Sequence, residues 1–256
     1  MIVYELSFQK NIRDIGGYVG YNHRKIKTGH LIRGGHLGKI SNEDAVILNS
    51  LGITDVIDFR SEDEFLGHPD FRIEGAIYHN YPLIEDKIKK EDRDNADGNL
   101  LWFVNEKDTG REHMIKSYRT LITSDIGKKS FSNFFKLIMS KNGTFYFHCS
   151  QGKDRAGLAA YMLEIALGVS EEDALKDYLL TNKAMEIRVK YLLEIEKKKP
   201  YYSLKYEQAL YDVFSAKEEF LNEALKAAKE EAGSMINYIK NILKVDIDKL
   251  REMYLE

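Results

Sequence analysis

Cysteine and paired metal ligands are scarce in this chain. Cys149 is its single cysteine, which excludes an internal disulfide and any zinc site built on clustered cysteines. The seven histidines show none of the paired spacings typical of metal ligands. We therefore expect neither a metal site nor another cofactor.

Proline, flexible linkers and long apolar runs are also missing. With three prolines and no Gly/Ser-rich stretch, the sequence indicates a single domain over residues 1–256. No window approaches the roughly 18 apolar residues that cross a bilayer, and the N-terminus lacks the apolar core of a secretion signal. We expect no transmembrane segment and a cytoplasmic protein, although a chain trimmed of an export signal would look the same.

Neither sign of charge dominates. The formal net charge is -3, with lysines and acidic residues interspersed. This balance gives no reason to expect nucleic acid, or an anionic membrane, as the main partner, so any basic site must be local. Oligomeric state stays unknown at this level.

The order of apolar patterns predicts an α/β fold. Residues 53–59, "ITDVIDF", are short, apolar and β-branched, as in a buried strand, and a helix is expected after Ser41. A second apolar run, "GTFYFH", precedes another helix, and such alternation favours a largely parallel sheet flanked by helices. From Ser170 onward the chain is mainly helical, a C-terminal extension over residues 170–256 in which Lys- and Glu-rich stretches are typical of solvated helix faces.

One segment, residues 84–110, is much more polar than the rest. It nevertheless contains an apolar kernel, "LLWF", that includes Trp102. Long polar loops with such a kernel often serve as lids or binding loops. A surface insertion pinned to the core by Trp102 is the alternative.

The chemistry concentrates between an apolar strand and the helix that follows it. Cys149 and Arg155 are separated by five residues, with Gly152 between them. The backbone N–H groups of residues 150–155 can converge at the helix N-terminus and bind an oxyanion. Gly152 permits the unusual dihedrals, and Arg155 is a two-pronged donor for phosphate oxygens. The loop residues Ser150, Gln151, Gly152, Lys153 and Arg155 are therefore the predicted substrate-binding set.

Cys149 is the predicted nucleophile. Thiols at helix N-termini near cations have pKa values lowered from about 8.5 to roughly 3.5–7.5, so a thiolate would lie beneath the bound phosphate. In-line attack then forms a phosphocysteine that water hydrolyses. Three rival interpretations fit less well: an ATP-binding loop lacks its upstream glycine and Ser/Thr, a cysteine protease has no use for Arg155, and an inert buried cysteine leaves the loop unexplained.

The segment "HCSQGKDRAG" closely resembles the signature of the cysteine-dependent protein tyrosine phosphatases. Its "GKDR" core is similar to an atypical bacterial branch that includes tyrosine and lipid phosphatases. The stretches "NIRDIGGY", "LIRGGHLGKIS", "LGITDVIDFRSEDE" and "EEAGSMINYIKNILKVDIDKLREMYL" also look like that branch. The resemblance implies a central sheet flanked by helices, no metal, and phosphotyrosine or phosphoinositide substrates.

The resemblance also suggests supporting roles. His148 is expected to fix the loop and favour the thiolate. Lys153 is expected at the rim of the substrate-binding loop. There it would either contact a second phosphate group of the substrate or be an exposed lysine that only adds positive charge. Ala156 departs from the pattern, because related loops carry a Thr or Ser there whose hydroxyl assists the thiolate when the phosphocysteine breaks down.

Charged residues of the N-terminal segments have family likeness without a clear role. For Arg13, Asp14 and Arg33 we expect structural ion pairing near the site. None of the three is assigned to catalysis.

Two aspartates compete to protonate the leaving group. Asp154 lies in the loop, where a bound phosphate should raise its pKa and keep it protonated, and the resemblance points to it as well. Asp58 ends a predicted strand, where α/β sheets present site residues, but it could instead orient an arginine such as Arg60. Asp154 is the predicted general acid and Asp58 the alternative.

These residues together predict a protein-tyrosine phosphatase that also accepts phosphoinositides or phosphoserine. One alternative is a phosphoinositide phosphatase with little activity on proteins. The other, kept open by Ala156, is a phosphopeptide-binding module with negligible turnover.

Overall fold

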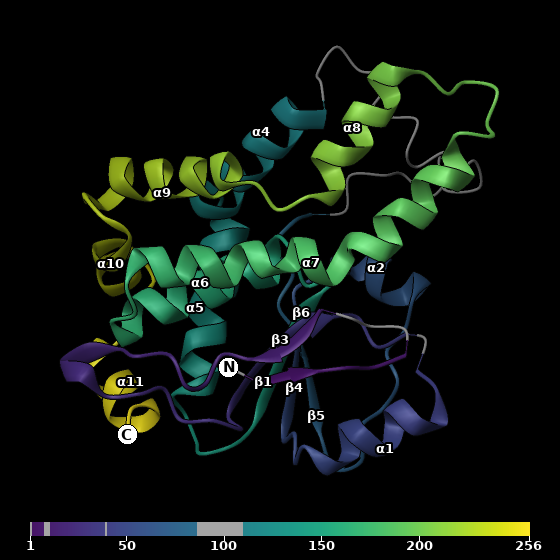
Figure 1. Cartoon of the computed structure of the whole chain (residues 1–256). Coiled ribbons are helices and arrows are strands. Elements are labelled where there is room, and N and C mark those ends of the chain that lie inside the picture. Colours follow the sequence, from purple (N-terminus) through teal and green to yellow (C-terminus); the bar gives the residue numbers. More distant parts are fainter. Residues whose placement is uncertain (1, 8–10, 39, 86–109) are drawn as a thin grey trace.

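The computed structural model describes residues 2–7, 11–38, 40–85 and 110–256. A six-stranded sheet lies at its centre, in the order β1-β2-β3-β6-β4-β5 (Figure 1). Four adjacent strands are parallel: β3 (Leu31–Gly35), β6 (Phe145–Cys149), β4 (Asp55–Asp58) and β5 (Ile77–Asn80). At the other side of β3, β2 (Ile12–Asp14) pairs antiparallel with β3, and β1 (Ile2–Tyr4) pairs antiparallel with β2 at the edge of the sheet. The expected largely parallel sheet is confirmed.

Helices cover both faces of the sheet and make up nearly all of the C-terminal part (Figure 1). They are η1 (Tyr21–His23), α1 (Asn42–Ser50), α2 (Glu62–Gly67), α4 (Gly110–Thr123), α5 (Asp125–Ile138), α6 (Arg155–Leu167), α7 (Glu171–Glu196), α8 (Leu204–Phe214), α9 (Glu218–Ala232), α10 (Met235–Asn237), η4 (Tyr238–Ile242) and α11 (Ile247–Tyr254). The helical extension from residue 170 is thereby confirmed, and no described helix could cross a bilayer.

The predicted helix starts coincide with observed caps. The Ser41 side chain accepts a hydrogen bond from the backbone N–H of Asp44, and Ser170 accepts one from Asp173. Each cap satisfies a backbone donor that has no partner within its helix. The candidate lid, by contrast, falls almost wholly on residues 86–109, which lie outside the described residues.

Alternating side chains of β6 show how the sheet separates two cores. Phe145, Phe147 and Cys149 belong to the larger apolar cluster, which also contains residues of α5, α6 and the C-terminal helices. Tyr146 belongs to the smaller cluster, with residues of β2, β3, β4 and α1. Because successive strand residues point to opposite faces, Cys149 ends the row that faces the larger core.

A third apolar cluster lies apart from these two. Met185, Val189 and Leu193 of α7 pack against three side chains of α8, namely Tyr206, Leu210 and Phe214. The distal half of α7 and α8 thus form a helical hairpin with its own small core, which projects from the body of the molecule (Figure 1).

Candidate active site

The predicted strand, loop and helix are present around the single cysteine. Cys149 is the last residue of β6, and Arg155 is the first residue of α6. The thiol is buried, at the carboxyl end of a central parallel strand, where α/β sheets place their sites. The loop between them, residues 150–154, is called the phosphate loop below.

Gly152 is required for two separate reasons. Its φ is +69°, in the left-handed region that favours glycine. A Cβ at this position would also lie 2.4 Å from the carbonyl carbon and oxygen of Gly34. The phosphate loop therefore packs directly on the backbone at the end of β3.

Three consecutive carbonyls of the phosphate loop are held from outside it. The carbonyl of Ser150 accepts from the His36 N–H at 3.2 Å. Those of residues 151 and 152 accept from Asn11 Nδ2 and Arg33 Nη2, each at 3.0 Å. In a planar trans peptide the N–H points opposite to the C=O, so the N–H groups of residues 151–153 face away from these partners. This orientation is the one that the predicted anion nest requires.

A buried ion-pair cluster supports that loop from the N-terminal strands. Arg13 Nε lies 2.9 Å from Asp177 Oδ1, and Arg33 Nη1 lies 2.5 Å from Asp177 Oδ2. Burial alone would raise the pKa of Asp177, but the two arginines outweigh it and lower that pKa. The expected structural ion pairing of Arg13 and Arg33 is confirmed. For Asp14 it is wrong: this carboxylate accepts backbone N–H groups of Gly16 and Gly29, at 2.7 and 2.5 Å.

Arg155 is held by a carboxylate that sequence reasoning missed. Its Nη1 and Nη2 donate to the two oxygens of Glu64, at 2.5 and 2.8 Å, and Nη2 also donates to Ser150 Oγ at 3.2 Å. Ser150 Oγ in turn donates to Glu64 Oε1 at 2.5 Å. Burial opposes ionisation of Glu64, but the bonds and charge of Arg155 and the Ser150 hydroxyl lower its pKa to about 2.

Glu64 is placed by its own local structure. Its side chain closes a capping box with Ser61 at the start of α2. The spacing of Ser61 and Glu64 in "RSEDE" is the signal that could have located this cap in the sequence. Nothing local, however, indicates that the same carboxylate also reaches Arg155.

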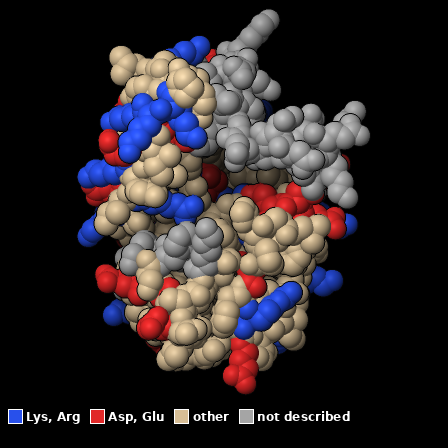
Figure 2. Space-filling view, turned by 90° about the vertical axis from the view of Figure 1, so that its right-hand side faces the viewer, with Lys and Arg blue, Asp and Glu red and all other residues tan. Residues whose placement is uncertain are grey.

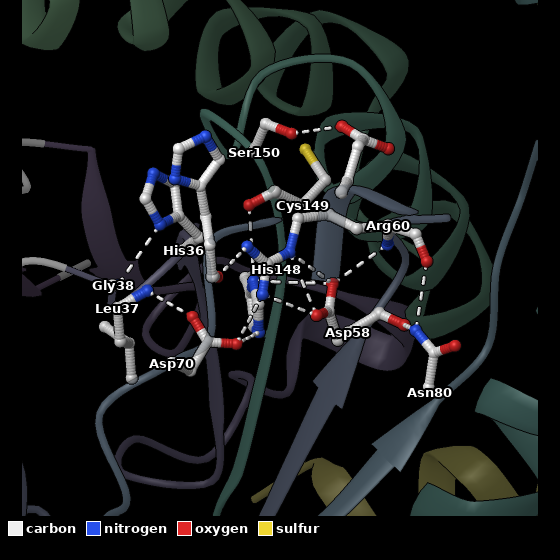
Figure 3. A network of polar contacts seen from close by, with 12 residues as sticks. His36, Leu37, Gly38, Asp58, Arg60, Asp70, Asn80, His148, Cys149 and Ser150 are labelled. Carbon is white, nitrogen blue, oxygen red and sulfur yellow. Dashed lines mark hydrogen bonds and ion pairs between the residues drawn. The ribbon is translucent and has the colours of Figure 1, made fainter. Parts of the chain in front are cut away.

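A second buried network lies beneath His148 (Figure 3). His148 Nε2 is 3.3 Å from Asp70 Oδ2, Nδ1 is 3.8 Å from Asp58 Oδ1, and Nδ1 is also 3.2 Å from the Cys149 carbonyl oxygen. Burial would lower the pKa of His148, but the charges of Asp58 and Asp70 outweigh it and raise that pKa. The position of His148 between this network and the Cys149 carbonyl oxygen fits the supporting role expected of it.

Asp58 is committed to Arg60 in this network. Arg60 donates to both Asp58 oxygens from its side chain, at 2.7–3.0 Å, and to Oδ1 from its backbone N–H at 2.8 Å. Arg60 Nη2 also donates to Asp70 Oδ2 at 2.6 Å. Of the two functions considered for Asp58, this geometry matches the orientation of an arginine.

Asp58, Asp70 and His148 also form a cluster that could hold a metal ion, since their ligating atoms lie within 4.8 Å of one another. The Arg60 guanidinium already binds both carboxylates. It supplies the positive charge that a cation would bring, so these residues do not fit a metal site.

Asp154 lies at the N-terminus of α6 and makes no capping hydrogen bond with its side chain. Its Oδ1 accepts from the Tyr118 hydroxyl at 2.8 Å and lies 3.2 Å from Lys153 Nζ. Burial, together with the charge of Asp154, raises the pKa of Tyr118 well above its ordinary value, so this phenol stays a neutral donor. No hydrogen bond to Asp154 Oδ2 is formed within the described part of the chain.

Lys153 does not lie at the rim. Its side chain is 1% exposed, and its ammonium donates to the backbone carbonyls of Val213, in the last turn of α8, and Ser215, just beyond that helix. The alternative of an exposed lysine is therefore wrong. In this structure Lys153 links the phosphate loop to the C-terminal end of α8.

Ala156 is fully buried and belongs to the larger core. The position that carries a hydroxyl in the related loops is therefore apolar here. Gln151, the remaining member of the predicted binding set, is half-buried in the phosphate loop.

Comparisons with known proteins identify the family of this chain. The profile of the tyrosine phosphatase family matches residues 4–256. A Cupriavidus necator protein, provisionally assigned as a tyrosine-protein phosphatase, is 28% identical over 263 residues, covering 98% of this chain and 89% of the relative. The triple specificity protein phosphatase PtpB of Mycobacterium tuberculosis is 26% identical over 200 residues, covering 71% and 70%. The chain therefore belongs to the tyrosine phosphatase family.

Proposed function

We propose that this protein hydrolyses phosphotyrosine through a phosphocysteine intermediate. The observation that carries the proposal is the phosphate loop: Cys149 at its start, three backbone N–H groups turned away from the partners of their carbonyls, and Arg155 at its end. This arrangement suits a tetrahedral dianion bound at the α6 N-terminus next to Cys149.

Arg155 can bind phosphate without releasing Glu64. The carboxylate of Glu64 holds the two terminal nitrogens, which leaves the Nε–H for the ligand. A guanidinium already fixed in orientation loses little freedom when the substrate arrives. Glu64 thus acts as a positioning residue for the phosphate clamp.

In the first step the Cys149 thiolate attacks phosphorus, the S–P bond forms and the P–O bond to the tyrosyl oxygen breaks. Asp154 gives its proton to that oxygen, through the oxygen not bound to Tyr118. In the second step the Asp154 carboxylate takes a proton from water, which attacks phosphorus. The S–P bond breaks, and inorganic phosphate and the thiolate are released.

We propose a broad substrate range for the same site, with phosphoserine and phosphoinositides as further substrates. The name of one relative, a triple specificity phosphatase, supports breadth beyond phosphotyrosine. The buried position of Lys153 does not favour a contact to a second phosphate in this conformation.

Phosphate release from phosphotyrosine peptides, phosphoserine peptides and soluble phosphoinositides tests the proposal. We expect the highest kcat/KM on phosphotyrosine peptides. The Cys149→Ser variant should release no phosphate from any substrate but should still bind the phosphotyrosine peptide. Turnover retained by Cys149→Ser would contradict the mechanism. Activity on phosphoinositides alone would favour the lipid phosphatase, and a burst equal to the enzyme without further turnover would favour the binding module.

A further inference from the structure

The distal hairpin, residues 183–214, exposes apolar side chains that its own core does not use. Ile187, Tyr191 and Ile195 follow one another at intervals of four along α7, and Ile187 is 81% exposed. Because they are displaced by two positions from the residues that pack on α8, they lie on the opposite face of α7. On α8, Leu204 is also 81% exposed. Several large apolar side chains gathered on one projection mark an interaction surface.

The same hairpin carries a concentration of positive charge. It contains seven Lys or Arg residues, four Glu and one Asp, a formal charge of +2 in a chain whose total is -3. Three consecutive lysines, Lys197, Lys198 and Lys199, are exposed where α7 ends. Among the described residues, the last two form no ion pair. Seen from the side of the molecule at which α7 ends, Lys and Arg side chains stand among uncharged ones in the upper part of the surface (Figure 2).

Two aromatic residues lie between the lysines and Leu204 in the sequence. Tyr201 and Tyr202 follow directly after Pro200, are half-buried and pack against the core of the hairpin. Tyrosine is the residue type that occupies the headgroup level of a bilayer, with its ring among the chains and its hydroxyl in water. Aliphatic side chains with a lysine fringe are typical of segments that lie in a membrane interface.

From these features we propose that the distal hairpin docks this protein on an anionic lipid surface. The lysine fringe argues against a protein partner, because lysine is depleted in protein interfaces. Two copies meeting through this patch would bring two net positive charges together, which argues against self-association. An anionic bilayer meets both the aliphatic side chains and the lysines.

Docking would bring the phosphate loop close to the membrane. The C-terminal end of α8 receives the Lys153 ammonium of that loop, and α8 has 11 residues, about 16 Å of helix. The loop therefore lies about one short helix away from the docked surface. The proposal concerns binding alone and does not depend on the proposed hydrolysis.

Co-sedimentation of the full chain with vesicles tests it. The vesicles contain phosphatidylcholine alone or phosphatidylcholine with 30 to 40% phosphatidylserine, about the range in which surface charge is strong. We expect binding to the anionic vesicles that weakens with salt, and little binding to the neutral ones. Each lysine near an anionic surface contributes about fivefold to the binding affinity. The double variant Lys198→Glu with Lys199→Glu should therefore bind at least about 25-fold more weakly than the wild type.

Matched controls separate the patch from the charge and apolarity of the whole chain. Lys129→Glu with Lys240→Glu gives the same net charge from exposed positions on α5 and η4 and should bind as the wild type does. Ile187→Asn with Leu204→Asn should lose binding, whereas Val46→Asn, an exposed apolar position on α1, should not. Thermal melts check that every variant is folded.

The proposal is overturned if the wild type does not sediment with anionic vesicles at low salt, or if both lysine pairs weaken binding equally. A second result would also overturn it. Light scattering would show that the wild type is a dimer and that the double variant Ile187→Asn with Leu204→Asn is a monomer, and neither protein would bind vesicles. Because vesicle binding needs no turnover, an inactive Cys149→Ser protein that binds normally keeps this result separate from the proposed function.

Discussion

Replacing Glu64 by Gln removes the charge that holds Arg155, and its effect on stability should depend on pH. The pKa of Glu64 falls from an ordinary 4.5 to about 2 in the folded protein, because Arg155 and Ser150 stabilise the carboxylate more than burial destabilises it. A depressed folded-state pKa contributes stability above the unfolded-state pKa and loses it as the pH falls through the folded one. The contribution is about 3 kcal/mol at pH 7, of which about 1 kcal/mol remains at pH 3.

Urea denaturation at pH 7, 5 and 3 measures this contribution. The free energy of unfolding of Glu64→Gln should lie below that of the wild type by up to about 3 kcal/mol at pH 7, and the gap should narrow by about 2 kcal/mol at pH 3. The amide can still accept one hydrogen bond from Arg155, which reduces the gap at pH 7. Glu62→Gln, at an exposed carboxylate of the same helix, is the control and should change stability by less than about 1 kcal/mol. A gap for Glu64→Gln that stays constant from pH 7 to pH 3 would refute the assigned interaction.

Four further substitutions test the chemistry of the site. Asp154→Asn should slow hydrolysis of phosphotyrosine by about 10²–10⁴-fold, and it should slow hydrolysis of an aryl phosphate with a very acidic phenol far less. Asp58→Asn should slow hydrolysis of both substrates by similar factors. The reverse pattern would assign the proton donor to Asp58. Ala156→Ser restores the hydroxyl that related loops carry and should raise steady-state turnover relative to the burst of product; an unchanged ratio would show that phosphocysteine breakdown does not limit turnover. Gly152→Ala should abolish phosphate binding measured by calorimetry, because the added Cβ would meet the Gly34 backbone at 2.4 Å, and normal affinity would show that the loop tolerates a side chain there.

Local patterns in the sequence were sufficient for the parts of this protein that are local in space. The Cys149 to Arg155 loop is one continuous segment, so its strand, its glycine and its helix N-terminus could be identified together. The caps at Ser41 and Ser170 likewise depend on residues three positions apart. For the same reason the apolar run around Asp58 correctly predicted a buried strand of the parallel part of the sheet.

Tertiary structure decided which charges meet. Arg155 and Glu64 are 91 residues apart, and Arg13 and Asp177 are 164 residues apart. No periodicity or spacing links such pairs, because their contact results from the packing of separate elements around the sheet. The direction of a side chain also could not be predicted from the sequence. The spacing correctly places Lys153 in the loop. Its ammonium, however, binds backbone carbonyls at the end of α8 and so does not lie at the rim, where we expected it.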